Sequence, residues 1–416
     1  ALARTAGRIL GAELAALGVN VNLAPVLDLA TRPANPVVGL RSFGDDPDLV
    51  AALGAAMVEG MQGAGVLACA KHFPGHGDTD VDSHHAAPTV DRTLAELMGL
   101  EVRPFRSAFD AGLAAVMTAH VRYPALEDAP ATFSAAVNRG LLRERLGFDG
   151  LILTDALDMH ALNGVPGPRR ARLALQAGAD LAVLGHLPGQ ERIVAGLAGL
   201  ASPGSRRRVA AARARLAGSG PQPVDPARDW AEHALRAKEI ARAAVTVVSG
   251  AGELPLALRP DDRLCVVTVA AGDLTPAETA AVGGVTLADQ VARRHPHLAA
   301  IGFAHGERRE EAIGHVLGAC EGAHTVVLAT VDAVSDPAQR RLFDALRERG
   351  HRPVVLALRS PLDGLALEGA RAALCCYGRR ADQTEAAVAV LFGEAEAKGT
   401  LPIGRRAQPP AVGVHP

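Results

Sequence analysis

Aromatic residues and net charge are both scarce in this sequence. Only 3% of its 416 residues are aromatic although 49% are hydrophobic, so the cores must be built mainly from Ala, Val and Leu. No aromatic platform for stacking single-stranded nucleic acid is expected. The charges nearly cancel, with 43 basic and 45 acidic residues. Because no basic field attracts a polyanion, nucleic acids and anionic membranes are not expected as partners.

Long apolar runs and paired cysteines are missing as well. No apolar run reaches the ~18 residues that a membrane-spanning helix needs, so we expect no membrane span. The five cysteines are odd in number, scattered and without a CxxC pair, which argues against a disulfide framework and a zinc ribbon. We expect them to be buried. The oligomeric state stays open, and a cytoplasmic location is favoured over a secreted or lipid-anchored one.

Helical stretches alternate with short apolar runs over residues 1 to about 200. The apolar runs are residues 19–26, 66–70, 114–119, 151–154 and 180–184. Stretches between them, such as 49–62 and 94–110, are long enough for crossover helices. Near-continuous apolar strands separated by helices predict a parallel sheet covered on both faces, which is either a β/α barrel or a doubly wound sheet.

Polar residues follow these apolar runs repeatedly. They are Asp28 after the first run, Lys71 and His72 after the second, His120 after the third and Asp155 after the fourth. In a β/α barrel the carboxyl ends of the strands meet at one mouth, where residues from different strands share one substrate. An open sheet would spread them along a line. The pattern therefore favours a TIM-type barrel.

A change of composition marks a domain boundary. Residues 202–225 are rich in Arg, Pro and Gly, which is typical of a linker. A helical stretch at 230–244 follows, and then apolar runs at 245–249, 264–269, 325–329, 353–358 and 373–377. These predict a second α/β domain. It contains neither GxGxxG nor GxxxxGK[ST], so a nucleotide cofactor would lack its usual phosphate cradle, and no cofactor is expected.

The segment 71–85, KHFPGHGDTDVDSHH, is the most unusual part of the chain, with four of its fifteen histidines. It begins with Lys71, one of three lysines beside forty arginines, which indicates a need for a compact ammonium donor. A solvated loop without function is the first alternative. A metal site formed by His72, His76, Asp80, Asp82 and His84 is the second, although Pro74 and Gly75 break any helix that would align the first pair.

Two carboxylates stand out as candidates for chemistry. Asp82 and His84 are two residues apart, so in an extended segment the carboxylate orients the imidazole for proton transfer near neutral pH; a local turn hydrogen bond is the alternative. Asp155 follows an apolar strand, where Lys71 would keep it ionised as a nucleophile; an N-cap is the alternative. Arg41 and His120 are candidate donors to substrate hydroxyls.

Taken together, these segments resemble glycoside hydrolase family 3, in its β-N-acetylhexosaminidase branch. The motifs occur in order: NLAPVLDLA, GLRSFGDDP, KHFPGHGDTDVDSH, VMTAHV and GLILTDALDM. The later SPLDGLAL and VLFGEAEAKGTLPIG resemble the αβα sandwich domain of longer members. The resemblance implies a barrel domain over 1–218, a linker and helix over 219–243, and a sandwich over 244–416. Because family members carry further strands ahead of this point, we expect an N-terminally incomplete barrel.

The resemblance also implies roles for single residues. Asp155 would be the nucleophile of a retaining exo-β-N-acetylglucosaminidase, and His84, assisted by Asp82, the general acid/base. The sugar would be bound by Lys71, His72, Asp28, Arg41 and His120. The expected substrate is a carbohydrate, a cell-wall or chitin-derived N-acetylglucosaminide. A β-N-acetylglucosaminide phosphorylase and an inactive sugar-binding homologue are the alternatives.

Overall fold

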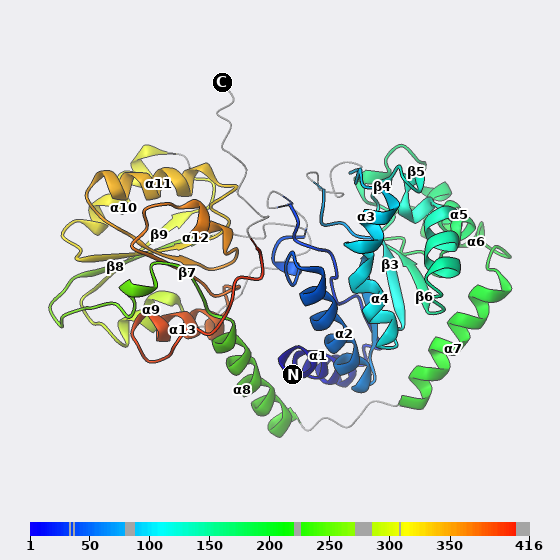
Figure 1. Cartoon of the computed structure of the whole chain (residues 1–416), viewed down its shortest axis with the longest axis horizontal. Helices are drawn as coiled ribbons and strands as arrows, with labels where there is room; N and C mark the ends of the chain where they lie inside the picture. The colour runs from blue at the N-terminus through cyan, green and yellow to red at the C-terminus, as the bar shows by residue number, and fades with distance from the viewer. Residues whose placement is uncertain are drawn as a thin grey trace. The chain divides into compact units, whose positions relative to one another are not determined.

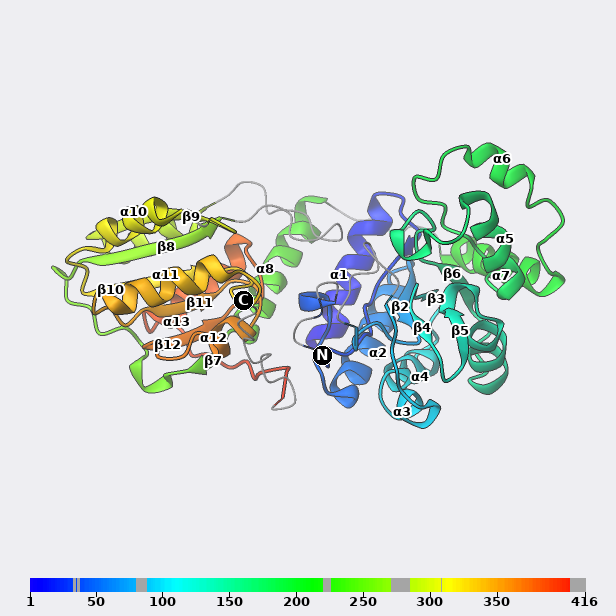
Figure 2. The ribbon, with the colours of Figure 1, turned by 90° about the horizontal axis from the view of Figure 1, so that it is seen from above.

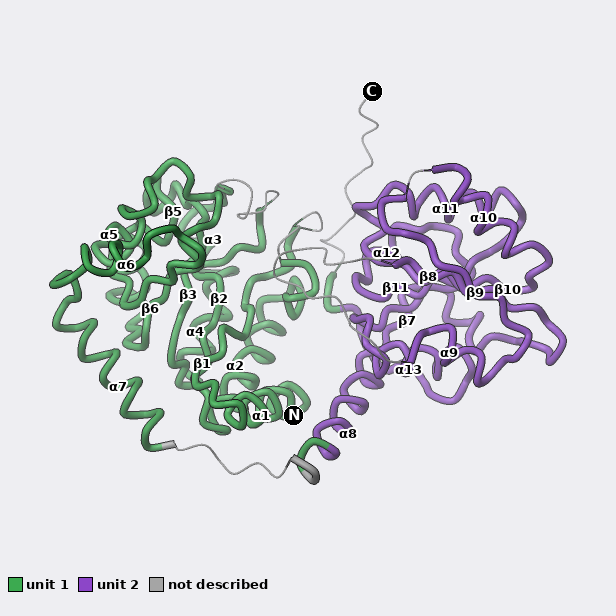
Figure 3. The backbone as a smooth tube through the Cα atoms, turned by 180° about the vertical axis from the view of Figure 1, so that it is seen from behind, with its two compact units in different colours: residues 1–230, 402–407 green, residues 231–401, 408–416 purple. Residues whose placement is uncertain are grey.

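The computed structural model describes residues 1–32, 35, 38–79, 88–219, 226–270, 285–307 and 309–404. The chain divides into two compact units, one of residues 1–230 and 402–407 and one of residues 231–401 and 408–416 (Figure 3). Each unit has its own hydrophobic core. None of the helices in the described ranges is long and apolar enough to span a membrane.

A parallel sheet forms the centre of unit 1. Its strands are β1 (Val21–Asn22), β2 (Leu67–Phe73), β3 (Ala115–Thr118) and β6 (Leu151–Thr154), hydrogen-bonded in that order. Leu181 pairs in parallel with Leu153 of β6, and Val26 pairs with Lys71 of β2. All five apolar runs predicted for this half of the chain therefore contribute to one row of parallel segments.

Helices and short irregular elements connect these strands. The helices are α1 (Leu2–Ala16), α2 (Pro47–Gly63), α3 (Leu94–Gly99), α4 (Val102–Asp110), α5 (Gly167–Ala177), α6 (Gln190–Ala195) and α7 (Pro203–Ser219). Shorter or tighter turns are η1 (Gly39–Arg41), η2 (Ala131–Phe133), the π-helix η3 (Ala136–Arg145) and η4 (His160–Leu162), and β4 (Arg122–Tyr123) pairs with β5 (Glu127–Pro130) as a hairpin. Val209 and Ala212 of α7 pack against a buried cluster from β2, β3 and β6.

The helix predicted over 94–110 is interrupted, and in this respect the prediction was wrong. α3 ends at Gly99 and α4 begins at Val102. Pro104 explains the break, because in a continuous helix its ring would collide with the Leu100 carbonyl and it would donate no hydrogen bond to it. In the first turn of a new helix proline is tolerated. The interruption places Glu101, the residue before α4, inside the unit with 1% of its surface exposed.

Unit 2 is built on a six-stranded sheet in the order β7-β12-β11-β10-β8-β9. Only β7 runs antiparallel, against β12. The strands are β7 (Thr246–Ser249), β8 (Leu264–Ala270), β9 (Leu298–Ala304), β10 (Thr325–Thr330), β11 (Val354–Ala357) and β12 (Ala372–Cys375). The remaining elements are α8 (Pro226–Ala244), η5 (Ala251–Glu253), α9 (Leu287–Ala292), α10 (Glu310–Cys320), α11 (Pro337–Glu348), α12 (Leu362–Ala366) and α13 (Ala381–Leu391).

Helices cover both faces of this second sheet. Figures 1 and 2 show α10 and α11 on one face and α9 and α13 on the other. The sequence predicted every described strand of this second sheet except β9, which is an edge strand of sequence LAAIGFA and is only partly buried. Ala and Gly are uncommon in strands, so composition did not reveal it. All five cysteines are buried, as predicted.

Candidate active site

The carboxyl ends of β1 and β2 bring Asp28 and His72 together. Leu27 donates its backbone N–H to the Lys71 carbonyl at 2.7 Å, so the chain after β1 runs beside the end of β2. His72 Nδ1 lies 2.6 Å from Asp28 Oδ2, and the His72 backbone N–H donates to Asp28 Oδ1 at 3.1 Å. Two contacts to one carboxylate fix both the backbone and the ring of His72.

Asp28 is completely buried and is ionised by its neighbours. Its Oδ1 also accepts the backbone N–H of His76 at 2.7 Å. Burial alone would raise the pKa of Asp28, but the charges and hydrogen bonds of His72 and His76 outweigh it and lower the pKa to about 2. A buried carboxylate that accepts several hydrogen bonds stays charged in this way. Asp28 is therefore a fixed negative charge in contact with His72 and His76.

His72 also faces Asp155, the predicted nucleophile. His72 Nε2 lies 3.7 Å from Asp155 Oδ2, so the imidazole stands between two carboxylates from different strands. Asp155 directly follows β6, and its Oδ1 accepts the Ala156 backbone N–H at 2.7 Å. Its side chain keeps 24% of its surface exposed. The carboxylate is thus held at one oxygen and accessible to a small molecule.

The charge of Asp155 follows from the groups around it. Burial raises its pKa, yet the pKa is lowered overall because His72, His120, the Ala156 N–H and Lys71 all stabilise the anion. Lys71, at the end of β2, is partly buried. Burial lowers the pKa of Lys71, while the Asp155 charge raises it in part. Each of these two charges thus favours the ionised form of the other.

His120, which follows β3, contacts the peptide after Asp155. Its Nε2 lies 2.9 Å from the Ala156 carbonyl oxygen, and its Nδ1 lies 2.7 Å from Thr132 Oγ1. Both ring nitrogens thus have protein partners, and burial lowers the pKa of His120. Its predicted contact with a substrate hydroxyl stays a prediction. The contacts that are present tie Thr132, which the sequence did not single out, to the peptide after Asp155.

His76 and Thr79 form a second supporting pair that sequence reasoning did not assign. His76 Nδ1 lies 3.0 Å from Thr79 Oγ1, and Asn35 Nδ2 donates to the same oxygen at 3.2 Å. Burial lowers the pKa of His76 to about 4, with His72 as the second cause, so it is neutral at pH 7. Gly77 is required here, because a Cβ would lie 1.8 Å from the Leu29 carbonyl oxygen.

The remaining predicted residues are placed differently. Arg41 ends η1 and contributes to the lowered pKa of Lys71 by its charge. Asp82 and His84 lie outside the described residues. Asp158, in the same loop as Asp155, accepts the His186 backbone N–H at 2.7 Å. Within the described ranges no group of three His, Cys, Asp or Glu side chains could hold a metal ion.

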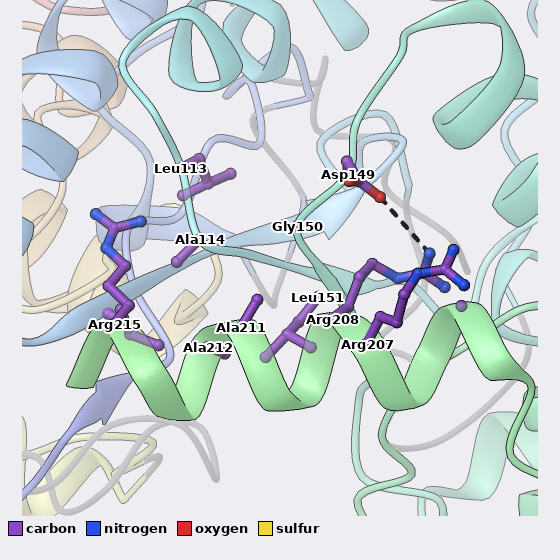
Figure 4. A pocket seen from close by; sticks show the side chains of 12 residues that line it. Leu113, Ala114, Asp149, Gly150, Leu151, Arg207, Arg208, Ala211, Ala212 and Arg215 are labelled. Atoms are coloured by element: carbon purple, nitrogen blue, oxygen red, sulfur yellow. Dashed lines mark ion pairs between the residues drawn. The ribbon is translucent and has the colours of Figure 1, made fainter. Parts of the chain in front are cut away.

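One pocket lies at the opposite end of the strands. It has a volume of about 280 Å³ and is lined by residues that precede β3 and β6, such as Ala114 and Gly150, together with Arg207 and Arg215 of α7 (Figure 4). Two of the residues that line it, Arg208 and Asp149, form an ion pair at 3.6 Å. In β/α folds the amino ends of the strands serve stability, so this pocket is not the candidate active site.

Comparison with known proteins agrees with this geometry. Residues 1–217, more than half of the chain, match the family model described as glycosyl hydrolase family 3 N terminal domain. The chain belongs to glycoside hydrolase family 3. As a member of this family, it has the expected fold class, a TIM-type (β/α) barrel domain followed by an αβα sandwich.

Several individual relatives are similar to this family 3 chain. The β-hexosaminidase of Chromobacterium violaceum is 43% identical over 230 residues, which are 55% of this chain and 62% of the relative. The β-hexosaminidase of Thiobacillus denitrificans is 45% identical over 188 residues, 45% of this chain and 52% of the relative. The chain therefore spans between half and two thirds of the length of these curated relatives.

A solved structure covers nearly all of the chain. The glycoside hydrolase family 3 β-N-acetylglucosaminidase from Paenibacillus sp. str. FPU-7 has a TM-score of 0.87 and 33% identity, and the match covers 97% of this chain and 79% of that one. A β-glucosidase from Listeria innocua, at 22% identity and a TM-score of 0.76, shares the fold. Both units of this chain thus have counterparts within the family.

Proposed function

We propose that this protein is a retaining exo-β-N-acetylglucosaminidase that removes terminal N-acetylglucosamine from cell-wall or chitin-derived oligosaccharides. The observation that carries the proposal is Asp155, an accessible carboxylate whose pKa is lowered and which faces His72. Family membership and the names of the similar proteins, β-hexosaminidase and β-N-acetylglucosaminidase, support the same substrate class.

The first step forms a covalent glycosyl-enzyme. Asp155 Oδ1 is held by the Ala156 N–H, which leaves Oδ2 to attack the anomeric carbon. The bond from that carbon to the leaving oxygen breaks, and its electron pair stays on the oxygen. His84, oriented by Asp82, donates a proton to this oxygen, so that the aglycone leaves as a neutral alcohol.

The second step releases the sugar with its configuration retained. His84, now neutral, takes a proton from water, and the water oxygen attacks the anomeric carbon while the bond to Asp155 breaks. Two inversions at the same carbon give net retention. Lys71 and His72 are proposed to bind sugar hydroxyls beside the nucleophile, with Asp28 and Arg41 completing the pocket. Asp28 acts largely through His72, because its oxygens already accept three protein hydrogen bonds.

Turnover of nitrophenyl β-N-acetylglucosaminide by this chain tests the proposal. We expect release of nitrophenol, no release from the β-glucoside, and free N-acetylglucosamine as product even when phosphate is present. Asp155→Asn should abolish release, whereas Asp158→Asn, a matched change in the same loop, should keep it. Sugar 1-phosphate as product would identify a phosphorylase, and binding of the sugar without turnover would identify a sugar-binding homologue.

A further inference from the structure

We propose that Arg92 is a positioning residue that joins the two ends of segment 80–87 through ion pairs with Asp78 and Glu101, and thereby sets the acid/base step of the reaction. The inference rests on the proposed function, because that function assigns Asp82 and His84 of the segment to proton transfer. Among the described residues, Arg92 makes its ion pairs with Asp78 and Glu101 and none with Asp155.

The ion pairs form a continuous chain. Arg92 Nη2 lies 2.9 Å from Asp78 Oδ2, and Arg92 Nε lies 2.9 Å from Glu101 Oε1. Arg32 Nε lies 3.1 Å from the other oxygen of Asp78. The side chains of Asp78 and Arg92 are each 20% exposed and that of Glu101 is 0% exposed. One guanidinium thus lies within ion-pair distance of two carboxyl groups from different parts of the chain. Among the described residues, Arg92 Nε and both Glu101 oxygens make no hydrogen bond, so the Glu101 contact is a charge contact.

The residues of this cluster flank segment 80–87 on both sides. Asp78 comes two residues before segment 80–87, and Arg92 comes five residues after it. The first end is fixed through Thr79, which bonds to His76 and Asn35. The second end is fixed by Arg122, whose backbone N–H donates to the Pro88 carbonyl at 3.0 Å. The Asp78–Arg92 pair is a direct side-chain link between these two ends.

The buried Glu101 carboxyl group is the second partner of the Arg92 side chain. The break before α4 buries this carboxylate beside Gly75, where a Cβ would lie 2.5 Å from Glu101 Cβ. Burial raises the pKa of Glu101 to about 7, and the Arg92 charge opposes that rise. Buried ion pairs contribute little net stability, and in some proteins they select one geometry among alternatives. The buried Glu101 carboxyl group beside Arg92 Nε therefore favours this position of the Arg92 side chain, and the ion pair with Asp78 links that position to Asp78.

The cluster is separate from the groups that hold the nucleophile. Asp155 is oriented by Ala156 and faces His72, and neither of these contacts Arg92 in the described residues. Loss of the cluster should therefore weaken proton transfer to the leaving oxygen and leave nucleophilic attack in place. This separation makes the proposal measurable, because a good leaving group departs without a proton and a poor one does not.

The experiment compares two N-acetylglucosaminides with the full chain, one with dinitrophenol and one with an alkyl alcohol as leaving group. For Arg92→Gln we expect kcat/KM to fall by about 100-fold for the alkyl glycoside, the lower range for loss of acid/base catalysis. The dinitrophenyl glycoside should lose less than about threefold, well below that range. Arg92→Lys should recover part of the loss. Arg103→Gln, which removes the exposed ion pair between Arg103 of α4 and Asp48 of α2, should change neither rate.

Three further variants keep the outcomes distinct. Asp78→Asn should show the same leaving-group dependence, and it replaces Arg92→Gln in the test if that variant does not fold. The double variant should lose no more kcat/KM than either single variant, because the effects of coupled residues are non-additive. Equal losses on both glycosides, or none, would overturn the positioning role. His84→Gln tests the proposed function itself. If this variant shows no leaving-group dependence, the assignment of His84 as the acid/base is wrong. If His84→Gln shows the dependence and Arg92→Gln does not, only the Arg92 proposal is rejected.

Discussion

Asp28 holds His72 by both its backbone and its ring, with the Nδ1 atom 2.6 Å from Oδ2 and the backbone N–H 3.1 Å from Oδ1. The carboxylate is fully buried and its pKa is lowered to about 2. Asp28→Asn replaces one acceptor oxygen with an amide donor that faces N–H groups. Breaking a buried charged pair costs about 3–5 kcal/mol.

We therefore expect Asp28→Asn to lower the free energy of unfolding by about 3 kcal/mol and to reduce kcat/KM for nitrophenyl β-N-acetylglucosaminide. Urea denaturation and steady-state kinetics measure the two effects. Asp110→Asn, at the exposed end of α4, is the control and should change neither. A stable Asp28→Asn variant with full activity would show that His72 is held by other groups.

Two buried groups give the stability opposite dependences on pH. The pKa of Glu101 is raised from 4.5 to about 7, so between these values the folded state holds the extra proton and stability rises as the pH falls. The pKa of His76 is lowered from 6.5 to about 4, so between these values the unfolded state holds the extra proton and stability falls with the pH. The two effects partly cancel.

Glu101→Gln removes the contribution of Glu101 to the pH dependence of stability. Relative to the parent protein, we expect this variant to lose about 2 kcal/mol of stability when the pH is lowered from about 7.5 to about 5, the size that proton linkage gives for a shift of this kind. Chemical denaturation at both pH values measures the difference. An identical pH dependence in the two proteins would mean that Glu101 titrates at its ordinary value in the folded state.

Thr132 contacts His120, which in turn contacts the Ala156 peptide next to Asp155. Thr132→Val removes the partner of His120 Nδ1 and frees the ring to turn away from the Ala156 carbonyl. We expect kcat to fall about tenfold with KM nearly unchanged, since a small displacement of a reacting group costs about this much or more. Thr330→Val, which removes a buried hydrogen bond to Asp363 in unit 2, should cost similar stability without changing kcat. Equal changes of kcat in both variants would point to a general loss of folded protein.

Gly77 permits the chain to pass close to Leu29. In Gly77→Ala the added Cβ would lie 1.8 Å from a backbone oxygen, and the backbone must move to relieve the contact. We expect a loss of more than about 3 kcal/mol of stability, as for other severe steric changes. Gly63→Ala, at the last residue of α2 with no atom near the added Cβ, should be neutral or slightly stabilising. Melting temperatures of the two variants, compared with that of the parent protein, measure this difference in stability.

The sequence predicted those parts of the molecule that depend on short-range patterns. Apolar runs located all five parallel segments of unit 1, and the polar residues after them located Asp28, His72 and Asp155. It did not predict the support of these residues, such as Thr132 behind His120 or Glu101 behind Arg92, because partners distant in sequence become neighbours only when the chain folds. Pro104 was a visible signal for the break before α4, and its position within a helical pattern could have revealed the buried Glu101.

The most direct test of the account is to trap the glycosyl-enzyme and locate it. A 5-fluoro N-acetylglucosaminyl fluoride, whose release from the enzyme is slowed, should add one sugar to the protein, and peptide mass spectrometry should place it on Asp155. Asp158→Asn should be labelled normally and Asp155→Asn should not be labelled. A sugar attached to another residue, or turnover without any covalent species, would contradict the assignment of Asp155 as the nucleophile.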